Sequence, residues 1–350
     1  MLAERLPASA IALGAPRLIV IVDTEEAFDW TKSHSRSASN VAHIAEQARA
    51  QQIYERYHLR PIYVVDYPVA TQEIGYRPLR EWLEDNRCEV GAHLHPWVNP
   101  PFDEELCPRN TYPGNLSPEL ERAKLSRLTE AVEENFHVRP KVYKAGRYGI
   151  GPATDATLDQ LGYQVDVSVV PQTDFGAVEG PDFRGIEVDP FWFGPSYRLL
   201  EIPLTVGWYG LMRRQGAGLQ RLLMTDLGMA LHLPGIFARL GLFERIRLTP
   251  EGMIFAELKR LTDTMLAMGK RVFCLSYHSP SLVAGNTPYV RDDADRARFL
   301  RLIEQYCEYF FGACGGAPST PRELYDLLRA GSAGDLTAVQ RKQVMTATPG

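Results

Sequence analysis

The chain has 350 residues and 45% hydrophobic side chains, enough to bury one large core, although length alone also allows two domains. A formal net charge of −5, a sequence pI near 6.0 and the lack of a lysine or arginine block argue against nucleic acid as a partner. The five cysteines form no CxxC pair, so we expect a reducing, cytoplasmic setting without a disulfide framework.

The two ends and the most apolar stretch of the chain set the expected domain boundaries. Residues 1–16 lack a basic start followed by a long apolar run, so we expect an N-terminal extension rather than a secretory signal. The apolar stretch 219–243 is interrupted by polar residues and is not typical of a membrane span. The small and polar residues of 329–350 predict a flexible tail, which leaves 17–328 as the folded unit.

Apolar strand-like runs alternate with amphipathic helix-like runs along the chain. Strands are predicted at 17–23, 61–67, 88–95, 141–144, 164–169, 199–206 and 271–277. Helices are predicted at 40–57, 72–86, 118–135, 152–161, 250–268, 292–311 and 321–328. Repeated strand–helix units predict a parallel sheet, either open and doubly wound or closed into a barrel. No GxGxxG motif follows the first strand, so the sequence does not indicate a dinucleotide fold.

The first strand ends in a run of acidic residues, Asp23-Thr24-Glu25-Glu26. Because residues two apart on a strand share a face, Asp23 and Glu25 would point together toward the mouth of the sheet. Acidic residues after a strand also occur simply as a solvated loop. The cluster taken alone leaves both interpretations open.

The third strand ends in a histidine pair, His93 and His95, whose spacing also places both rings on one face. Neutral imidazoles are good zinc ligands, and two of them with one carboxylate leave an open coordination position for water. The alternative is one core histidine and one exposed histidine, which the spacing does not exclude.

Two later strands end in further residues with catalytic chemistry. The sequence KAGRYG follows the fourth strand, where Lys144 and Arg147 could hold a carboxylate, stabilise an oxyanion or simply form a basic surface turn. The sequence LSYHSP closes the last strand, where His278 could be a general acid or a structural loop histidine. The carboxyl ends of barrel strands form one active-site face, so a barrel would bring these groups together.

This order of an acidic cluster, a histidine pair, a basic turn and a late histidine resembles the polysaccharide deacetylase (NodB-like, carbohydrate esterase) family. The matching segments are IVDTEEAFDW, EVGAHLHPW, YKAGRYGIG, GYQVDVSVVP and LSYHSPSL. The DTEE and HLHPW signatures look closest to the WalW-like bacterial branch. The resemblance implies a distorted (β/α)7 barrel with an aromatic and helical insertion at 170–247. It also implies a divalent metal, which we expect to be zinc, and hydrolysis of N-acetyl groups on sugars.

The resemblance also implies roles for individual residues. The catalytic residues it implies are Asp23, Lys144, Arg147 and His278. The metal ligands it implies are Glu25, His93 and His95. The residues expected to contact the substrate or support the site are Glu26, Trp97, Tyr148 and Asp166, the last by orienting Arg147 or Lys144. Asp23 would be the base that deprotonates water, and His278 the acid that protonates the leaving amine.

The sequence departs from the family pattern in the second and third motifs. Two histidines separated by three residues are usual there, and Trp97 stands where the second would be, so His95 must serve instead. The usual arginine of the third motif aligns better with Lys144, and Arg147 is a neighbouring alternative. These departures also admit a member that has lost activity.

The predicted function is metal-dependent removal of N-acetyl groups from a sugar or polysaccharide precursor, with a carbohydrate as the partner. The alternatives are a hydrolase of a non-sugar amide on the same fold and a non-catalytic carbohydrate-binding protein of a polysaccharide pathway. Aromatic residues of the insertion could stack on sugar rings or pack a small core of their own. These residues are Phe191, Trp192, Phe193, Tyr197, Trp208 and Tyr209.

The strongly apolar segment 218–243 admits two interpretations. One is a helical hairpin split at Pro234-Gly235 and packed on the barrel. The other is a peripheral patch that meets a lipid-linked sugar precursor at a membrane surface. Arginines around the segment could attract anionic headgroups, namely Arg213, Arg214, Arg221, Arg239, Arg245 and Arg247. The sequence does not indicate an oligomeric state.

Overall fold

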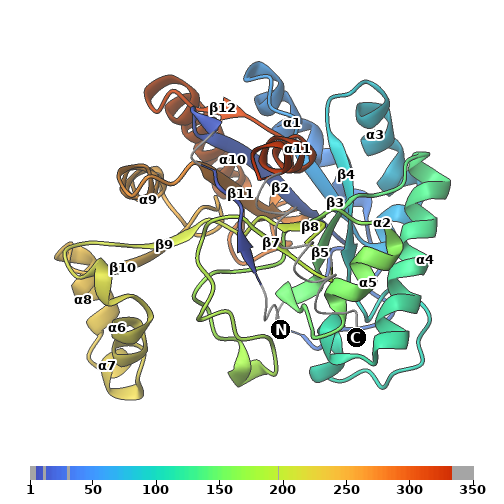
Figure 1. The fold of residues 1–350 in the computed structure, drawn as a ribbon, viewed down its shortest axis with the longest axis horizontal. Coiled ribbons are helices and arrows are strands. Elements are labelled where there is room, and N and C mark those ends of the chain that lie inside the picture. Colours follow the sequence, from blue (N-terminus) through green and yellow to red (C-terminus); the bar gives the residue numbers. More distant parts are fainter. Residues whose placement is uncertain (1–4, 11–12, 30–31, 196, 333–350) are drawn as a thin grey trace, which may run out of the picture.

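The computed structural model describes residues 5–10, 13–29, 32–195 and 197–332. A curled sheet runs through the centre, and helices surround its outer face (Figure 1). The strand order is β1-β7-β8-β6-β5-β4-β3-β2-β11, and β12 pairs with β2. The strands are β1 (Leu6–Pro7), β2 (Arg17–Thr24), β3 (Ile62–Val65), β4 (Glu89–Leu94), β5 (Val142–Ala145), β6 (Val165–Asp166), β7 (Phe191–Phe193), β8 (Leu199–Glu201), β11 (Val272–His278) and β12 (Ala317–Pro318).

The seven strands predicted from the sequence are β2, β3, β4, β5, β6, β8 and β11, and they pair in parallel with one another. Seven of the eight residues of β2 are buried, as expected for a parallel strand covered on both faces. The two ends of this row of strands are joined by single hydrogen bonds rather than by a ladder. Cys274 N in β11 donates to Thr205 Oγ1, which follows β8, and Ser276 N in β11 donates to Leu248 O, whose own N–H donates to Thr205 O. The predicted distorted barrel is confirmed.

The helices around the sheet follow the predicted positions. They are α1 (Gln47–Arg56), α2 (Tyr67–Thr71), α3 (Glu73–Glu84), α4 (Pro118–Phe136), α5 (Thr154–Leu161), α9 (Phe255–Ala267), α10 (Asp293–Glu308) and α11 (Pro321–Gly331). Ser117 caps α4 by accepting from Leu120 N. The helix expected from residue 250 begins five residues later, because Glu251 N donates to Thr249 Oγ1 and the chain turns into a loop before Phe255.

The N-terminal extension contributes to the sheet. Leu6 stands opposite Trp192 and Pro7 opposite Phe191, so β1 forms the antiparallel edge beside β7. At the other end of the chain, α11 runs into the region expected to be a flexible tail. The remainder of that prediction, 333–350, lies outside the described residues.

The inserted region 170–247 divides into two parts. Its first part contains β7 and β8, which belong to the central sheet. Its second part is a lobe carried on an antiparallel ribbon of β9 (Val206–Tyr209) and β10 (Glu244–Arg247). The three short helices of the lobe are α6 (Gly216–Leu223), α7 (Asp226–Ala230) and α8 (Leu233–Arg239). Figure 1 shows them projecting from the lower left of the barrel.

The expectation of a helical hairpin packed on the barrel is wrong, because the segment forms three short helices carried on the β9–β10 ribbon. The chain breaks before α8, and Pro234 lies in the first turn of that helix, where its missing N–H costs no hydrogen bond. None of the helices in the described part of the chain has the length and apolar content needed to cross a bilayer.

Candidate active site

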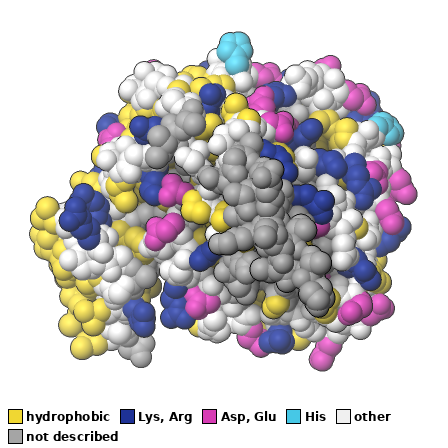
Figure 2. Space-filling view, in the orientation of Figure 1, with side chains coloured by type: hydrophobic (Ala, Val, Ile, Leu, Met, Phe, Trp, Pro, Cys, Tyr) yellow, Lys and Arg dark blue, Asp and Glu magenta, His cyan; other side chains and the backbone are white. Residues whose placement is uncertain are grey.

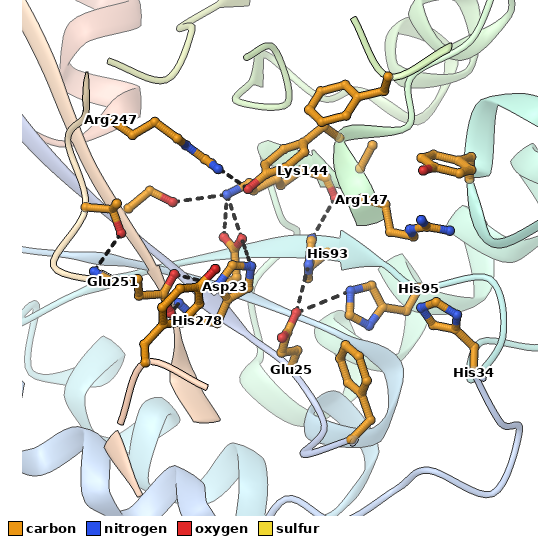
Figure 3. A pocket seen from close by; sticks show the side chains of 18 of the residues that line it. Asp23, Glu25, His34, His93, His95, Lys144, Arg147, Arg247, Glu251 and His278 are labelled. Atoms are coloured by element: carbon orange, nitrogen blue, oxygen red, sulfur yellow. Dashed lines mark hydrogen bonds and ion pairs between the residues drawn. The ribbon is translucent and has the colours of Figure 1, made fainter. Parts of the chain in front are cut away.

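The carboxyl ends of β2, β4, β5 and β11 bring the predicted polar residues to one face of the sheet. In the β11–β2 ladder His278 stands opposite Asp23, and in the β4–β5 ladder His93 stands opposite Lys144. Paired residues of a ladder share a face, as do residues two apart along one strand. Figure 3 shows these side chains, together with Glu25, pointing into one cavity.

Glu25, His93 and His95 form a compact group of potential metal ligands, with one donor atom from each within 4.8 Å of the others. Glu25 Oε2 lies 3.4 Å from Nε2 of both histidines. The other carboxylate oxygen, Oε1, is buried without a hydrogen-bond partner among the described residues. A cation would satisfy that oxygen, and two imidazoles with one carboxylate suit zinc. The residues therefore fit the divalent metal that the resemblance implies.

The other ring nitrogen of each histidine, Nδ1, contacts an oxygen atom that orients the ring. His93 Nδ1 donates to the carbonyl of Lys144 at 3.1 Å, and His95 Nδ1 lies 2.9 Å from Glu26 Oε2. A proton on Nδ1 leaves the lone pair of Nε2 directed at Glu25. Burial lowers the pKa of both rings, that of His95 to about 4, so both are neutral at pH 7 as metal ligands must be.

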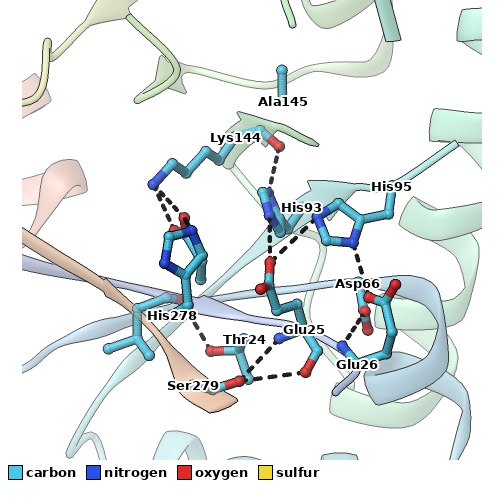
Figure 4. Close-up of polar contacts among 12 residues, drawn as sticks. Thr24, Glu25, Glu26, Asp66, His93, His95, Lys144, Ala145, His278 and Ser279 are labelled. Atoms are coloured by element: carbon cyan, nitrogen blue, oxygen red, sulfur yellow. Dashed lines mark hydrogen bonds and ion pairs between the residues drawn. The ribbon is translucent and has the colours of Figure 1, made fainter. Parts of the chain in front are cut away.

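Glu26 and Trp97 support His95. Trp97 Nε1 donates to Glu26 Oε1 at 2.6 Å, and the indole stacks on the His95 ring with centroids 4.1 Å apart. Glu26 N donates to Asp66 Oδ2 at 2.6 Å, and Asp66 also caps α2 (Figure 4). Burial raises the pKa of Glu26 to about 8. Asp66 was not predicted from the sequence.

Asp23 and Lys144 form a buried ion pair. Lys144 Nζ donates to both carboxylate oxygens, at 2.6 and 2.7 Å, and also to Ser276 Oγ at 3.2 Å. Burial acts to raise the pKa of Asp23, but the positive charges of Lys144 and His278, together with the neighbouring His93 ring, more than offset it, so the pKa is lowered. Asp23 is therefore a carboxylate at neutral pH.

His278 is held by Glu251, a residue that the sequence analysis missed. His278 Nδ1 lies 2.9 Å from Glu251 Oε2, and His278 N donates to Glu251 Oε1 at 3.1 Å. Ser281 Oγ donates to the same carboxylate. Burial acts to lower the pKa of His278, but Glu251, Glu25 and Asp23 outweigh it and the pKa is raised well above its ordinary value. The other ring nitrogen, Nε2, is 3.6 Å from Asp23 Oδ2.

The cavity above these groups has a volume of about 680 Å³. Its aromatic lining comes from Phe28, Trp97, Tyr112, Tyr148, Phe175 and Tyr289. Its cationic lining, besides Lys144, comes from Lys32, Arg147 and Arg247. Arg247, which the sequence grouped with the arginines around the apolar segment, donates from Nη2 to Tyr148 Oη at 2.7 Å.

The turn after β5 separates the two cations that the sequence left as alternatives. Arg147 and Tyr148 have left-handed backbone, with φ of 55° and 62°. The Arg147 guanidinium is thereby carried to the cavity wall, 4.1 Å over the ring of Tyr112. Lys144 is the cation that contacts Asp23.

No family model and no curated protein matches the sequence. The fold is similar to that of a candidate polysaccharide deacetylase from Mycobacterium smegmatis, with a TM-score of 0.54 and 16% identity over 95% of this chain and 96% of that one. It is also similar to a candidate glycoside hydrolase/deacetylase from Parabacteroides distasonis, with a TM-score of 0.57 and 11% identity over 90% and 72% of the two chains. The chain has the polysaccharide deacetylase fold. Its placement in the WalW-like branch stays a prediction.

Within this deacetylase fold, Asp166 does not occupy the place expected for it. Across the β5–β6 ladder Asp166 stands opposite Tyr143, one residue away from Lys144, and neighbouring strand residues face opposite ways. Its carboxylate accepts from Ser168 N at 3.1 Å and interacts with Glu201. Asp166 therefore packs against Ser168 and Glu201 instead of orienting Lys144 or Arg147.

The six aromatic residues that the sequence singled out in the insertion do not line the cavity. Phe191, Trp192, Phe193 and Tyr197 are buried in the core. Trp208 stacks on Phe243 inside the lobe, with ring centroids 6.3 Å apart. One aromatic ring of the cavity, Phe175, comes from the inserted region, and the others come from elsewhere in the chain. The expectation of a small core of the insertion's own is wrong for Phe191, Trp192, Phe193 and Tyr197, which pack in the central core.

Proposed function

We propose that the protein is a metal-dependent hydrolase that removes N-acetyl groups from a sugar or polysaccharide precursor. The observation that carries the proposal is the arrangement in one cavity of two charged pairs, Asp23 with Lys144 and His278 with Glu251, beside a potential metal group. Glu25, His93 and His95 would hold the metal. When bound, a zinc-like ion acidifies a water and polarises the amide carbonyl.

Asp23 is the base in this proposal. Its lowered pKa keeps the carboxylate ready to take a proton from the attacking water, and Lys144 fixes both of its oxygens. Lys144 thereby takes the place of the arginine that is usual in the family. Arg147 and Tyr148, on the cavity wall, are left to contact the substrate.

His278 is the acid in this proposal. Its raised pKa keeps the imidazole protonated at neutral pH, so that Nε2 can deliver a proton to the leaving amine. Glu251 holds Nδ1 and fixes the ring orientation. His278 Nε2 lies 3.6 Å from Asp23 Oδ2, so one small group such as an amide can contact both the acid and the base.

A sugar is the substrate that the aromatic lining of the cavity favours. Aromatic rings stack on the apolar faces of sugars, and a cavity of about 680 Å³ has room for a short oligosaccharide. The two structures compared above are described as a candidate polysaccharide deacetylase and a candidate glycoside hydrolase/deacetylase. These likenesses support a carbohydrate substrate without naming it.

The test is release of acetate from N-acetylated glucosamine oligomers and from peptidoglycan fragments by zinc-loaded protein. We expect turnover by the wild type and a rate about 10²–10⁴-fold lower for Asp23→Asn. Equal acetate release by both proteins would remove the proposed role of Asp23.

The cations of the cavity wall favour one alternative, a hydrolase of an anionic non-sugar amide. Arg147 and Arg247 have no acidic partner in an ion pair within the described chain, and guanidinium groups bind carboxylates and phosphates well. An N-acetylated amino acid panel assayed beside the oligosaccharides separates the two substrates.

A further inference from the structure

The lobe at 206–247 exposes an apolar surface that its own packing leaves open. Between the two strands of its ribbon, Leu223 and Phe243 are the buried apolar side chains among those described, at 3% and 4% exposure. Leu211 is 81% exposed and Leu227 is 69% exposed. The large apolar side chains that the segment 211–240 exposes are Leu211, Leu222, Met224, Leu227, Met229, Leu231, Ile236 and Leu240. In Figure 2 they form a yellow rim along the outer edge of the lobe.

Such a concentration of apolar surface marks an interaction site. Single exposed leucines are ordinary on soluble proteins, whereas contiguous patches are rare unless a partner covers them. The lobe stands away from the barrel on a two-stranded ribbon, so the rest of the described chain does not cover this rim (Figure 1).

The charge of the same segment indicates which partner it fits. The whole chain has a net charge of −5, but 211–240 holds four arginines and a single acidic residue, a net charge of +3 from 4 − 1. All four arginines are exposed, and none forms an ion pair with an acidic side chain in the described structure. They are Arg213, Arg214, Arg221 and Arg239.

We propose that the lobe docks on the surface of an anionic lipid bilayer. The leucine and methionine side chains of α6, α7 and α8 lie in the interface, and the arginines contact the negatively charged headgroups. Short helices with exposed leucines and flanking arginines suit a peripheral position on the bilayer. A second copy of the chain fits less well, because a two-fold contact would bring the same arginines together.

Two arginines that the sequence grouped with these lie elsewhere. Arg245 donates to Thr173, and Arg247 donates to Tyr148 in the cavity wall. Strand β10 therefore runs from the membrane-facing lobe to the cavity. A docked lobe would hold the cavity close to the bilayer, where a substrate with a lipid anchor is concentrated. This last step rests on the proposed function, whereas the docking itself does not.

The first experiment is co-sedimentation of the full chain with vesicles. Phosphatidylcholine vesicles are compared with mixed vesicles of phosphatidylcholine and phosphatidylglycerol, at low and moderate salt. We expect the protein to pellet with the anionic vesicles and binding to weaken as salt rises. Protein that stays in the supernatant in every condition overturns the proposal.

Two sets of variants locate the contact. Leu222→Ser/Leu227→Ser/Leu240→Ser should lose binding. The control Ile74→Ser/Ile254→Ser/Met268→Ser changes side chains that are 58–61% exposed elsewhere and should bind as the wild type does. Equal binding by the lobe variant and its control would overturn the proposed surface.

The arginine variant tests the electrostatic part and leaves the apolar rim intact. Arg213→Gln/Arg221→Gln/Arg239→Gln should weaken binding to anionic vesicles by about 100-fold, since each arginine near the bilayer contributes about fivefold. The control removes three exposed arginines outside the lobe, Arg77, Arg127 and Arg291. Equal weakening by both variants would show a general charge effect and contradict the proposal.

Two further measurements distinguish membrane docking from self-association and from a failure of the proposed hydrolase. Sedimentation equilibrium reports self-association, and a dimer that the leucine variant dissolves, without vesicle binding, would assign the rim to a second copy. Acetate release from a water-soluble substrate reports the cavity. Lobe variants should keep that rate, so loss of docking and failure of the proposed hydrolase are distinguishable.

Discussion

Asp23 and His278 face each other with pKa values displaced in opposite directions. Lys144 lowers the pKa of the carboxyl group, and Glu251 raises the pKa of the imidazole against the effect of burial. One group is then a ready base and the other a ready acid at the same pH. The roles differ because each group has its own buried partner of opposite charge, Lys144 for Asp23 and Glu251 for His278.

Asp23→Asn should separate catalysis from metal binding. The amide cannot accept the proton of water, so we expect kcat to fall by about 10²–10⁴-fold. The ligands Glu25, His93 and His95 are unchanged, so metal content should be that of the wild type. Rate measurement together with elemental analysis checks both parts. Loss of the metal in this variant would make Asp23 a ligand.

Glu251→Gln should move the alkaline side of the pH–rate profile. The negative charge of Glu251 raises the pKa of His278, so its removal lowers that pKa and the acid form is lost at a lower pH. We therefore expect activity to decline earlier as the pH rises. Glu179→Gln, an exposed substitution, is the control. An unchanged alkaline limb in Glu251→Gln would leave Glu251 with a structural role.

Lys144→Met should leave a buried carboxylate without its partner. Breaking such a pair lowers the free energy of unfolding by about 3–5 kcal/mol at neutral pH. Because the pKa of Asp23 is lowered in the folded protein, the pair stabilises above the unfolded pKa and its contribution is lost as the pH falls. Urea unfolding at pH 7 and pH 3 should show the difference between variant and wild type shrinking once the pH falls below the ordinary pKa of an aspartate, about 3.9. A constant difference would contradict this account.

At the scale of the elements, the strands were predictable and the loops between them were not. The apolar runs that form β2, β4 and β5 have the composition of buried parallel strands, and their ends carry the polar residues by simple two-residue periodicity. The sequence thus predicts Asp23 near Glu25, and His93 near His95. The register between strands, which sets Lys144 opposite His93, comes only from the fold.

The missed residues share one property, which is that a loop carries each to its partner. Glu251 contacts His278 across 27 residues, and Asp66 contacts Glu26 across 40. Thr249-Pro250 has the pattern of a helix start, and that pattern hid the role of Glu251. No local spacing distinguishes such an acidic residue from a surface one.

Gly146→Ala tests the turn after β5. A Cβ at this position would lie 2.4 Å from Leu94 O and 2.7 Å from the His95 ring, so the ring must move. We expect weaker metal binding, seen as a higher dissociation constant in a chelator competition. Gly185→Ala, which meets nothing within 4 Å, should bind as the wild type does. Equal affinity of the two variants would show that the turn does not position His95.

The whole molecule combines a barrel that carries the site with a lobe that departs from it. The barrel buries its core between sheet and helices, whereas the lobe keeps leucines in solvent beside arginines. Composition did not predict that the lobe stands apart from the barrel, because the apolar residues of 218–243 are equally compatible with a packed hairpin. Only their placement on the β9–β10 ribbon shows that they face outward.

The central claim is that Glu25, His93 and His95 bind a divalent metal in this cavity. Elemental analysis of the full chain, purified without chelator and dialysed against zinc, tests it most directly. We expect about one equivalent per chain, as a single site requires, weakened by His93→Ala and abolished by His95→Ala. Metal-free wild type under these conditions, or a full equivalent retained by both variants, would contradict the claim.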